Sequence, residues 1–139
     1  MAESEAMADS KHLDFLQAVI TRLAGNSFLV KGWSITLTTA IVGLAVKDGG
    51  GAFALVGLPA VAVFAMLDAY YLALERCFRH RFETAAATYA ENRPADFNMA
   101  SGFAAADFFK ALVRPAVLLP HVMLAAVLVA TWLLLCRAG

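Results

Sequence analysis

Three long stretches of this sequence are almost free of charged residues, and they limit what the chain can fold into more than any other feature. Residues 32–46 and 116–136 contain no Asp, Glu, Lys or Arg, and residues 49–74 contain only Asp68. The hydrocarbon core of a bilayer is about 30 Å thick and takes about 20 helical residues to cross. Two of the stretches are long enough alone, and the first becomes so when residues 26–31 are added. The chain is therefore expected to be an all-α integral membrane protein with three transmembrane helices.

Composition points the same way. Hydrophobic residues make up 61% of the chain and charged residues only 16%, whereas a typical soluble domain is about 45–50% apolar. A soluble bundle of unusually apolar helices is the disfavoured alternative. The formal net charge is zero and the basic residues form no dense cluster, so nothing indicates a nucleic-acid partner.

The chain is expected to form one membrane domain over residues 1–139, with an amphipathic helix ahead of the first span. Apolar residues recur at spacings of three and four between Leu13 and Leu23, which places them on one helix face. Gly25 and Asn26 are expected to end or kink this helix. The predicted elements are the amphipathic helix (10–25), span 1 (28–46), span 2 (52–74, kinked at Pro59, its helix extending into the cytoplasm to about residue 90), a short amphipathic helix capped by Ser101 (101–114) and span 3 (116–136).

Lysine and arginine are distributed unevenly around these spans. Nine of them lie before span 1 or between spans 2 and 3, counting Lys31, whose ammonium group is expected to reach the membrane surface. Only Lys47 and Arg137 lie on the other side. Because basic residues favour the cytoplasmic side, we expect a bacterial inner (plasma) membrane protein with its N-terminus in the cytoplasm and its C-terminus outside.

Asp68 is a candidate functional residue because ionisable side chains are rare inside membrane spans. It lies seven residues before Glu75, where the charged segment begins, and so roughly 10 Å inside the membrane. His121 falls at a similar depth in span 3. On span 1, Thr36, Thr38 and Thr39 lie about six residues in from Lys31, which predicts the same depth for them. We therefore predict an intramembrane polar layer of Asp68, His121, Thr38 and Tyr71.

Two interpretations of this layer remain open. A carboxylate and an imidazole can exchange protons along an ion or proton path. The same groups can instead form interhelical hydrogen bonds that fix the helix register, worth about 1 kcal/mol each in membranes. Packing is the favoured interpretation, because three helices cannot easily enclose a transport path without other subunits.

Charged residues continue along one face of the helix after span 2. Glu75 and Arg79 are four residues apart, a spacing at which opposite charges can pair. The predicted cytoplasmic contact face, for a neighbouring copy or a cytoplasmic partner protein, consists of Glu75, Arg76, Arg79 and Glu83. Ordinary basic flanking of a membrane span is the alternative explanation.

No pattern of catalytic residues is recognisable. The sequence lacks a serine or cysteine nucleophile with a plausible base, a glycine-rich phosphate loop and a metal-spaced group of histidines and carboxylates. We therefore expect a protein that is not an enzyme, with no catalytic residue, no metal and no cofactor.

Two segments, NSFLVKGWS at residues 26–34 and LDAYYLALER at residues 67–76, resemble small uncharacterised bacterial inner-membrane proteins. Some of those proteins look like membrane effectors of antiphage defence systems. The resemblance covers about the first 85 residues. It implies an effector that acts on the inner membrane when a partner protein signals.

Together these features predict a homo-oligomeric membrane effector or a channel-like assembly, whose partners are the lipid bilayer and further copies of the chain. Two alternatives use the same residues. The chain could be an accessory or assembly subunit of a larger membrane complex, or a subunit of a proton-coupled transporter.

Overall fold

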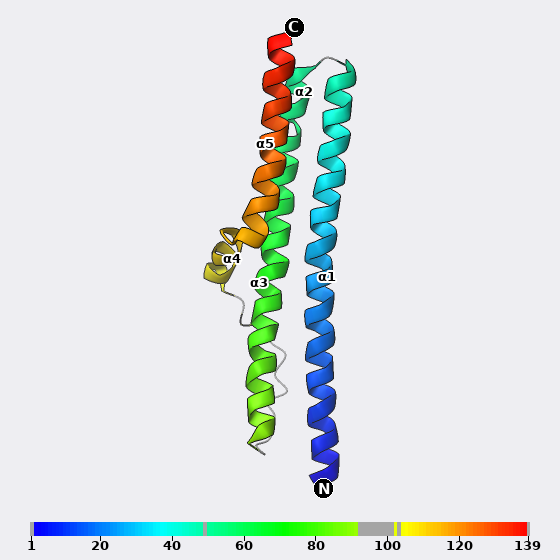
Figure 1. The fold of residues 1–139 in the computed structure, drawn as a ribbon. Helices are drawn as coiled ribbons and strands as arrows, with labels where there is room; N and C mark the ends of the chain where they lie inside the picture. Colours follow the sequence, from blue (N-terminus) through cyan, green and yellow to red (C-terminus); the bar gives the residue numbers. More distant parts are fainter. Residues whose placement is uncertain (1, 49, 92–101, 103, 139) are drawn as a thin grey trace.

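A computed structural model describes residues 2–48, 50–91, 102 and 104–138. Its helices, in chain order, are α1 (Ala2–Asp48), α2 (Gly51–Leu55), α3 (Gly57–Ala90), α4 (Ala105–Leu112) and α5 (Pro115–Ala138) (Figure 1). No strand occurs in these ranges. Three helical segments are long and apolar enough to cross a membrane, which confirms the expected all-α fold with three candidate spans.

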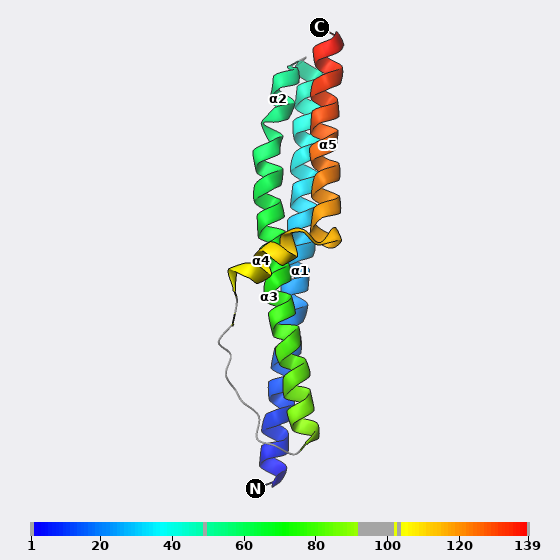
Figure 2. The ribbon, with the colours of Figure 1, turned by 90° about the vertical axis from the view of Figure 1, so that its left-hand side faces the viewer.

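The helices form a long, thin bundle. α1 and α3 run antiparallel, and α5 lies beside α2 and α3 at the end of the bundle where α1 turns into α2 (Figures 1 and 2). α1 has 47 residues and α5 has 24, so their lengths are about 70 Å and 36 Å. α1 and α3 therefore project well past the start of α5; this projecting pair, residues 10–21 and 75–90, is called the stalk below.

The expected helix end at Gly25 and Asn26 is wrong. α1 is one continuous helix, so the predicted amphipathic helix (10–25) and span 1 (28–46) are parts of the same element. A glycine inside a helix costs about 1 kcal/mol relative to alanine but does not prevent the helical conformation. Here Leu23 and Ser27, on either side of Gly25, are both buried against the rest of the bundle, and this packing outweighs the local signal.

Span 2 is interrupted three residues before Pro59 rather than kinked at it. α2 ends at Leu55 and α3 begins at Gly57, with Val56 in a turn whose N–H donates to the Phe53 carbonyl at 3.1 Å. A proline ring clashes with the carbonyl four residues earlier and offers it no N–H. For Pro59 that carbonyl belongs to Leu55, so the interruption lies where the steric conflict arises.

α4 is shorter than predicted and lies across the bundle (Figure 2). It begins at Ala105, and its N-cap, Ala104, makes no side-chain capping bond; Ser101 and the predicted loop at 92–101 lie outside the described residues. Ala111 is buried with Ala69, Ala73 and Val117, and the opposite side of α4 exposes Phe109. α5 continues through Pro120, close to the predicted bounds of span 3.

The packed face of α1 changes character along its length. In and beside the stalk it buries large aliphatic side chains, Leu16, Ile20 and Leu23. Further along, the same face buries small ones instead: Ser27, Ser34, Thr38 and Ala45. Small residues allow close backbone approach, which is the usual basis of helix association inside membranes.

The closest approach to α5 is made at Gly57. A methyl group added to Gly57 would lie 2.8 Å from Leu128 Cδ1 and 2.9 Å from Cδ2, and the Leu128 side chain is fully buried. The start of α3 and the middle of α5 therefore pack closely at Gly57, where an added side chain would displace the Leu128 methyl groups.

Gly57→Ala and Leu128→Ala are each expected to lower the free energy of unfolding, by about 1–3 kcal/mol for overpacking and about 2–5 kcal/mol for the lost leucine contacts. The double variant should lose clearly less than the sum of the two, because the smaller residue 128 leaves space for the added methyl group. Denaturant titration in detergent, followed by circular dichroism, measures the effect. Gly43→Ala is the control, since nothing lies within 4 Å of its added methyl group; additive losses would contradict the proposed fit.

Candidate functional site

Asp68 is the centre of a cluster of polar side chains inside the bundle. It lies on α3 with none of its surface exposed. On the facing helix α1, the Lys31 ammonium is 2.6 Å from Asp68 Oδ1, and the Ser27 hydroxyl donates to the same oxygen at 2.5 Å. Lys31 Nζ also donates to Ser27 Oγ at 3.0 Å. The three side chains therefore form a closed triangle that joins α1 to α3.

The third span contributes His121. Its ring is 5% exposed, and Nδ1 lies 2.8 Å from the Val117 carbonyl and 4.0 Å from Asp68 Oδ2. A carbonyl can only accept, so Nδ1 carries a proton and donates it to Val117. The imidazole is thus held beside the carboxylate without a hydrogen bond to it, and all three spans meet at this level.

Three buried polar atoms of the cluster and its surroundings have no hydrogen-bond partner among the described residues. They are Asp68 Oδ2, His121 Nε2 and Ser34 Oγ, one from each span. A buried polar group without a partner costs about 1–3 kcal/mol. A carboxylate, an ammonium and an imidazole in one layer can hold or exchange a proton, but among the described residues no group of His, Cys, Asp and Glu is arranged to bind a metal ion.

Lys31 forms an ion pair within the bundle, in place of the expected extension of its side chain to the membrane surface. Its side chain is only 26% exposed and points to Asp68. His121, six residues from the start of α5, is about 9 Å inside that end, and Asp68, Lys31 and Ser27 lie at the same level. An unpaired lysine at the end of an apolar run would extend to the interface, but here a buried carboxylate on α3 offers a stronger interaction.

Because the cluster forms at the level of Ser27 and Lys31, Thr38 lies outside it. Thr38 is buried at 3% exposure, but it lies eleven residues beyond Ser27 and so about 16 Å deeper along α1. Tyr71 is half-buried and makes an edge-to-face contact with Tyr70, with ring centroids 5.8 Å apart. Of the four predicted layer residues, the structure brings together Asp68 and His121, whereas Thr38 and Tyr71 lie outside the cluster.

The predicted contact face lies on the stalk. Arg79 donates to Glu75 at 2.6 Å, with the Glu75 side chain mostly buried and Arg79 mostly exposed. Arg76 and Glu83 are exposed. The exposed part of this face is therefore formed by Arg76, Arg79 and Glu83, while Glu75 serves as the partner that holds Arg79 in place.

Sequence reasoning missed Ser27 and Lys31 as site residues. Their signal is present: residues 27, 31, 34 and 38 are all polar and recur at spacings of four, three and four, which places them on one face of a helix. A helix boundary at Gly25 and Asn26, together with a surface position for Lys31, hides this polar face in the sequence.

A second pattern on α1 was also missed. Gly25, Gly32, Thr36, Thr39 and Gly43 are all exposed, and at 100° per residue they form a narrow line opposite the packed face. An added methyl group on any of the three glycines has no atom within 4 Å. We call these five residues the α1 stripe; it presents small residues on the outside of the bundle, with the exposed Leu29 between Gly25 and Gly32.

No protein family, curated protein or solved structure matches this chain. The resemblance to small bacterial membrane effectors therefore stays a prediction.

Lys31→Met is expected to destabilise the protein more than Asp68→Asn. Removal of the lysine leaves a buried, uncompensated carboxylate, which costs about 3–5 kcal/mol. Asp68→Asn keeps a hydrogen-bonding group for Ser27, and the partly exposed Lys31 can then extend to the membrane surface. Thermal unfolding in detergent checks the order of the two variants.

The double variant Lys31→Met/Asp68→Asn should be more stable than Lys31→Met alone, because it removes the stranded charge. Lys47→Met is the control, since this lysine is exposed at the far end of α1. Equal losses for the two single variants would rule out an ion pair between Lys31 and Asp68.

Proposed function

We propose that this protein is a non-enzymatic subunit of a homo-oligomeric, channel-like assembly that acts on the bacterial inner membrane. In this proposal α1 lines the contacts between copies, and the stalk receives a signal from a cytoplasmic partner. The Lys31–Asp68 pair fixes α1 against α3, so that the α1 stripe faces a neighbouring copy.

The α1 stripe is the observation that carries the proposal. Each of its three glycines costs about 1 kcal/mol relative to alanine within a helix, and no contact inside the chain requires them. Small residues at such spacings let a second helix approach closely in a bilayer, where exposed apolar side chains have no driving force to leave the lipid. The two threonines already donate to their own backbone, at 2.9 Å each, so the stripe offers shape rather than hydrogen bonds.

The interior of one copy leaves no space for an ion path between its spans. This favours a path that lies between copies. The space between the three spans is occupied by Ala69, Val117, Leu128 and Asp68, none of which has any exposed surface. A carboxylate paired in this way is better suited to holding the spans in register than to passing ions. A proton-coupled transporter subunit is accordingly the least supported of the three classes of function.

An accessory subunit of a larger membrane complex is the second candidate, and the stalk favours it. Phe15 is 57% exposed and Tyr89 41% exposed, although both lie beyond the start of α5 and therefore outside the segment that α5 crosses. In this candidate function, these two side chains contact the other protein of the complex. Stoichiometry separates the candidates, because an accessory subunit requires a different chain.

The purified protein in mild detergent is expected to form a closed assembly of identical copies, and Gly32→Leu/Gly43→Leu should convert it to monomers. Leucine is a better helix former than glycine and meets no atom of its own chain, so the monomer should stay folded. Native mass spectrometry gives the number of copies. Leu37→Phe, which enlarges an exposed side chain on another side of α1, is the matched control.

The same variants should be compared in liposomes loaded with a fluorescent dye. We expect dye release by the wild-type protein and by Leu37→Phe, and a large loss of release for Gly32→Leu/Gly43→Leu. A wild-type monomer, or an assembly that the glycine variant leaves intact, would reject the proposed role of the stripe. If the protein assembles but the liposomes release neither dye nor ions, the proposed oligomer is retained and the proposed channel-like function is rejected.

The proposed orientation predicts which cysteine an impermeant maleimide reaches from outside intact cells. Cys136 is exposed near the end of α5, and Cys77 lies in the stalk at the opposite end. Cys136 should react and Cys77 should react only after the cells are opened. Cys77→Ser and Cys136→Ser isolate each signal; labelling of Cys77 alone in intact cells would invert the topology.

A further inference from the structure

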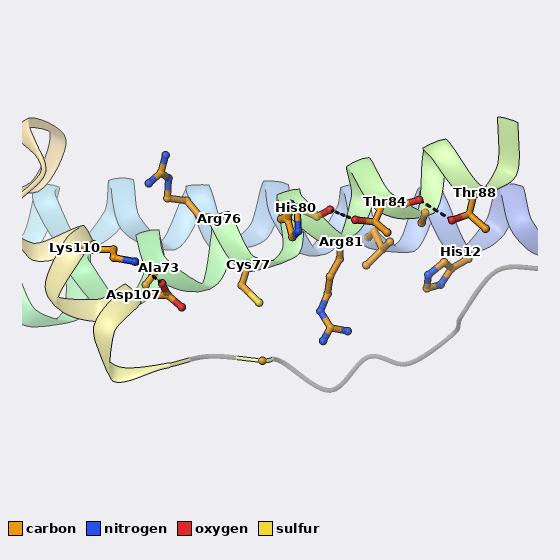
Figure 3. A pocket seen from close by; sticks show the side chains of 13 residues that line it. His12, Ala73, Arg76, Cys77, His80, Arg81, Thr84, Thr88, Asp107 and Lys110 are labelled. Carbon is orange, nitrogen blue, oxygen red and sulfur yellow. Dashed lines mark hydrogen bonds and ion pairs between the residues drawn. The ribbon is translucent and has the colours of Figure 1, made fainter. Parts of the chain in front are cut away.

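A groove on the stalk has the charge and the position of a site for a phosphate group. It has a volume of about 550 Å³ and is lined by all three neighbouring elements, α1, α3 and α4. Among the described lining residues the cationic side chains are Arg76, Arg81 and Lys110, and the only carboxylate is Asp107. Figure 3 shows the side chains of Arg81, from α3, and Lys110, from α4, among the lining residues.

The uncharged polar groups of the groove leave its cations as the main donors. The Thr84 hydroxyl donates to the His80 carbonyl at 3.0 Å, and the Thr88 hydroxyl donates to the Thr84 carbonyl at 2.9 Å (Figure 3). Their protons are therefore committed to the α3 backbone. An acceptor that enters the groove meets chiefly ammonium, guanidinium and imidazole groups, which is an environment for an anion.

Lys110 is available to such an anion. Its ammonium lies 3.8 Å from Asp107, and both side chains are largely exposed, at 75% and 49%. A solvent-exposed pair at that distance contributes little to stability. A phosphate, with its larger negative charge, competes well for the lysine.

The position of α4 indicates the source of the phosphate. Only two residues separate α4 from α5, so α4 lies at the membrane surface. The exposed Phe109 of α4 and its exposed C-cap residue Val113 are typical of a helix in the interface. The end of the groove next to Lys110 and Ala73 thus opens at the level of lipid headgroups. From Ala73 to Arg81 the groove extends about 12 Å along α3, enough for the polar headgroup of a phospholipid.

We propose that this groove binds the headgroup of an anionic phospholipid, with the phosphate at Lys110 and the rest of the headgroup directed along α3 toward Arg81. Basic pockets beside membrane helices recognise anionic lipids in this way. The groove is formed by one copy of the chain, so lipid binding there can be tested separately from the proposed assembly.

Native mass spectrometry of the full-length protein with added phosphatidylglycerol or phosphatidylcholine of the same chains tests the proposal. The wild-type protein should retain phosphatidylglycerol at least about tenfold better, since each cation near a membrane surface changes lipid affinity about fivefold. Arg81→Gln/Lys110→Gln should lose this preference. Arg81→Lys/Lys110→Arg, which keeps both charges, should preserve it.

Lys47→Gln/Arg137→Gln is the matched control, because it removes two exposed cations from the opposite end of the bundle. If this control loses the preference for phosphatidylglycerol as fully as Arg81→Gln/Lys110→Gln does, the preference depends only on net charge and the proposal is overturned. Equal retention of the two lipids would also overturn it, as would displacement of phosphatidylglycerol by an equal concentration of glycerol 3-phosphate, which would assign the groove to a soluble phosphate ester. If the double glutamine variant does not fold, Lys110→Gln alone, at a largely exposed side chain, must still weaken retention about fivefold.

Discussion

The rest of the structure depends on one ion pair inside the bundle, between Lys31 and the fully buried Asp68. A charged side chain in the apolar part of a membrane is tolerated when it finds a partner inside the protein. Lys31 and Asp68 satisfy each other across α1 and α3, with Ser27 as a second donor to the same carboxylate oxygen. Because loss of the lysine would leave the buried Asp68 carboxylate without its cation, the pair fixes both the rotation and the level of α1 against α3.

That constraint orders the remaining contacts. With the polar face of α1 directed at α3, its small residues allow close packing on that side, and the α1 stripe is necessarily directed away. The same register brings His121 to the carboxylate from α5. One intramembrane interaction thus determines which surface of α1 is left for contact with another molecule.

The sequence predicts the positions of most helices along the chain well, but it predicts the contacts between the helices poorly. Long apolar runs are sufficient for the three candidate spans, for the extension of α3 and for the approximate bounds of α5, because each depends on local composition. The partner of Asp68 was not predicted, because Lys31 is 37 residues away and a lysine at the end of an apolar run has an equally good local explanation at the membrane surface. The break at Val56 could have been predicted from the carbonyl that Pro59 displaces, but the continuity of α1 through Gly25 required knowledge of the packing of Leu23 and Ser27.

The unbroken length of α1 has a mechanical consequence. A helix of about 70 Å that is joined to α3 near its middle, at Ser27 and Lys31, carries the projecting segment and the first candidate span as one element. Because no break separates these two segments of α1, a rotation of either segment about the helix axis would be transmitted to the other. The second span differs in this respect, since its helix is interrupted at Val56.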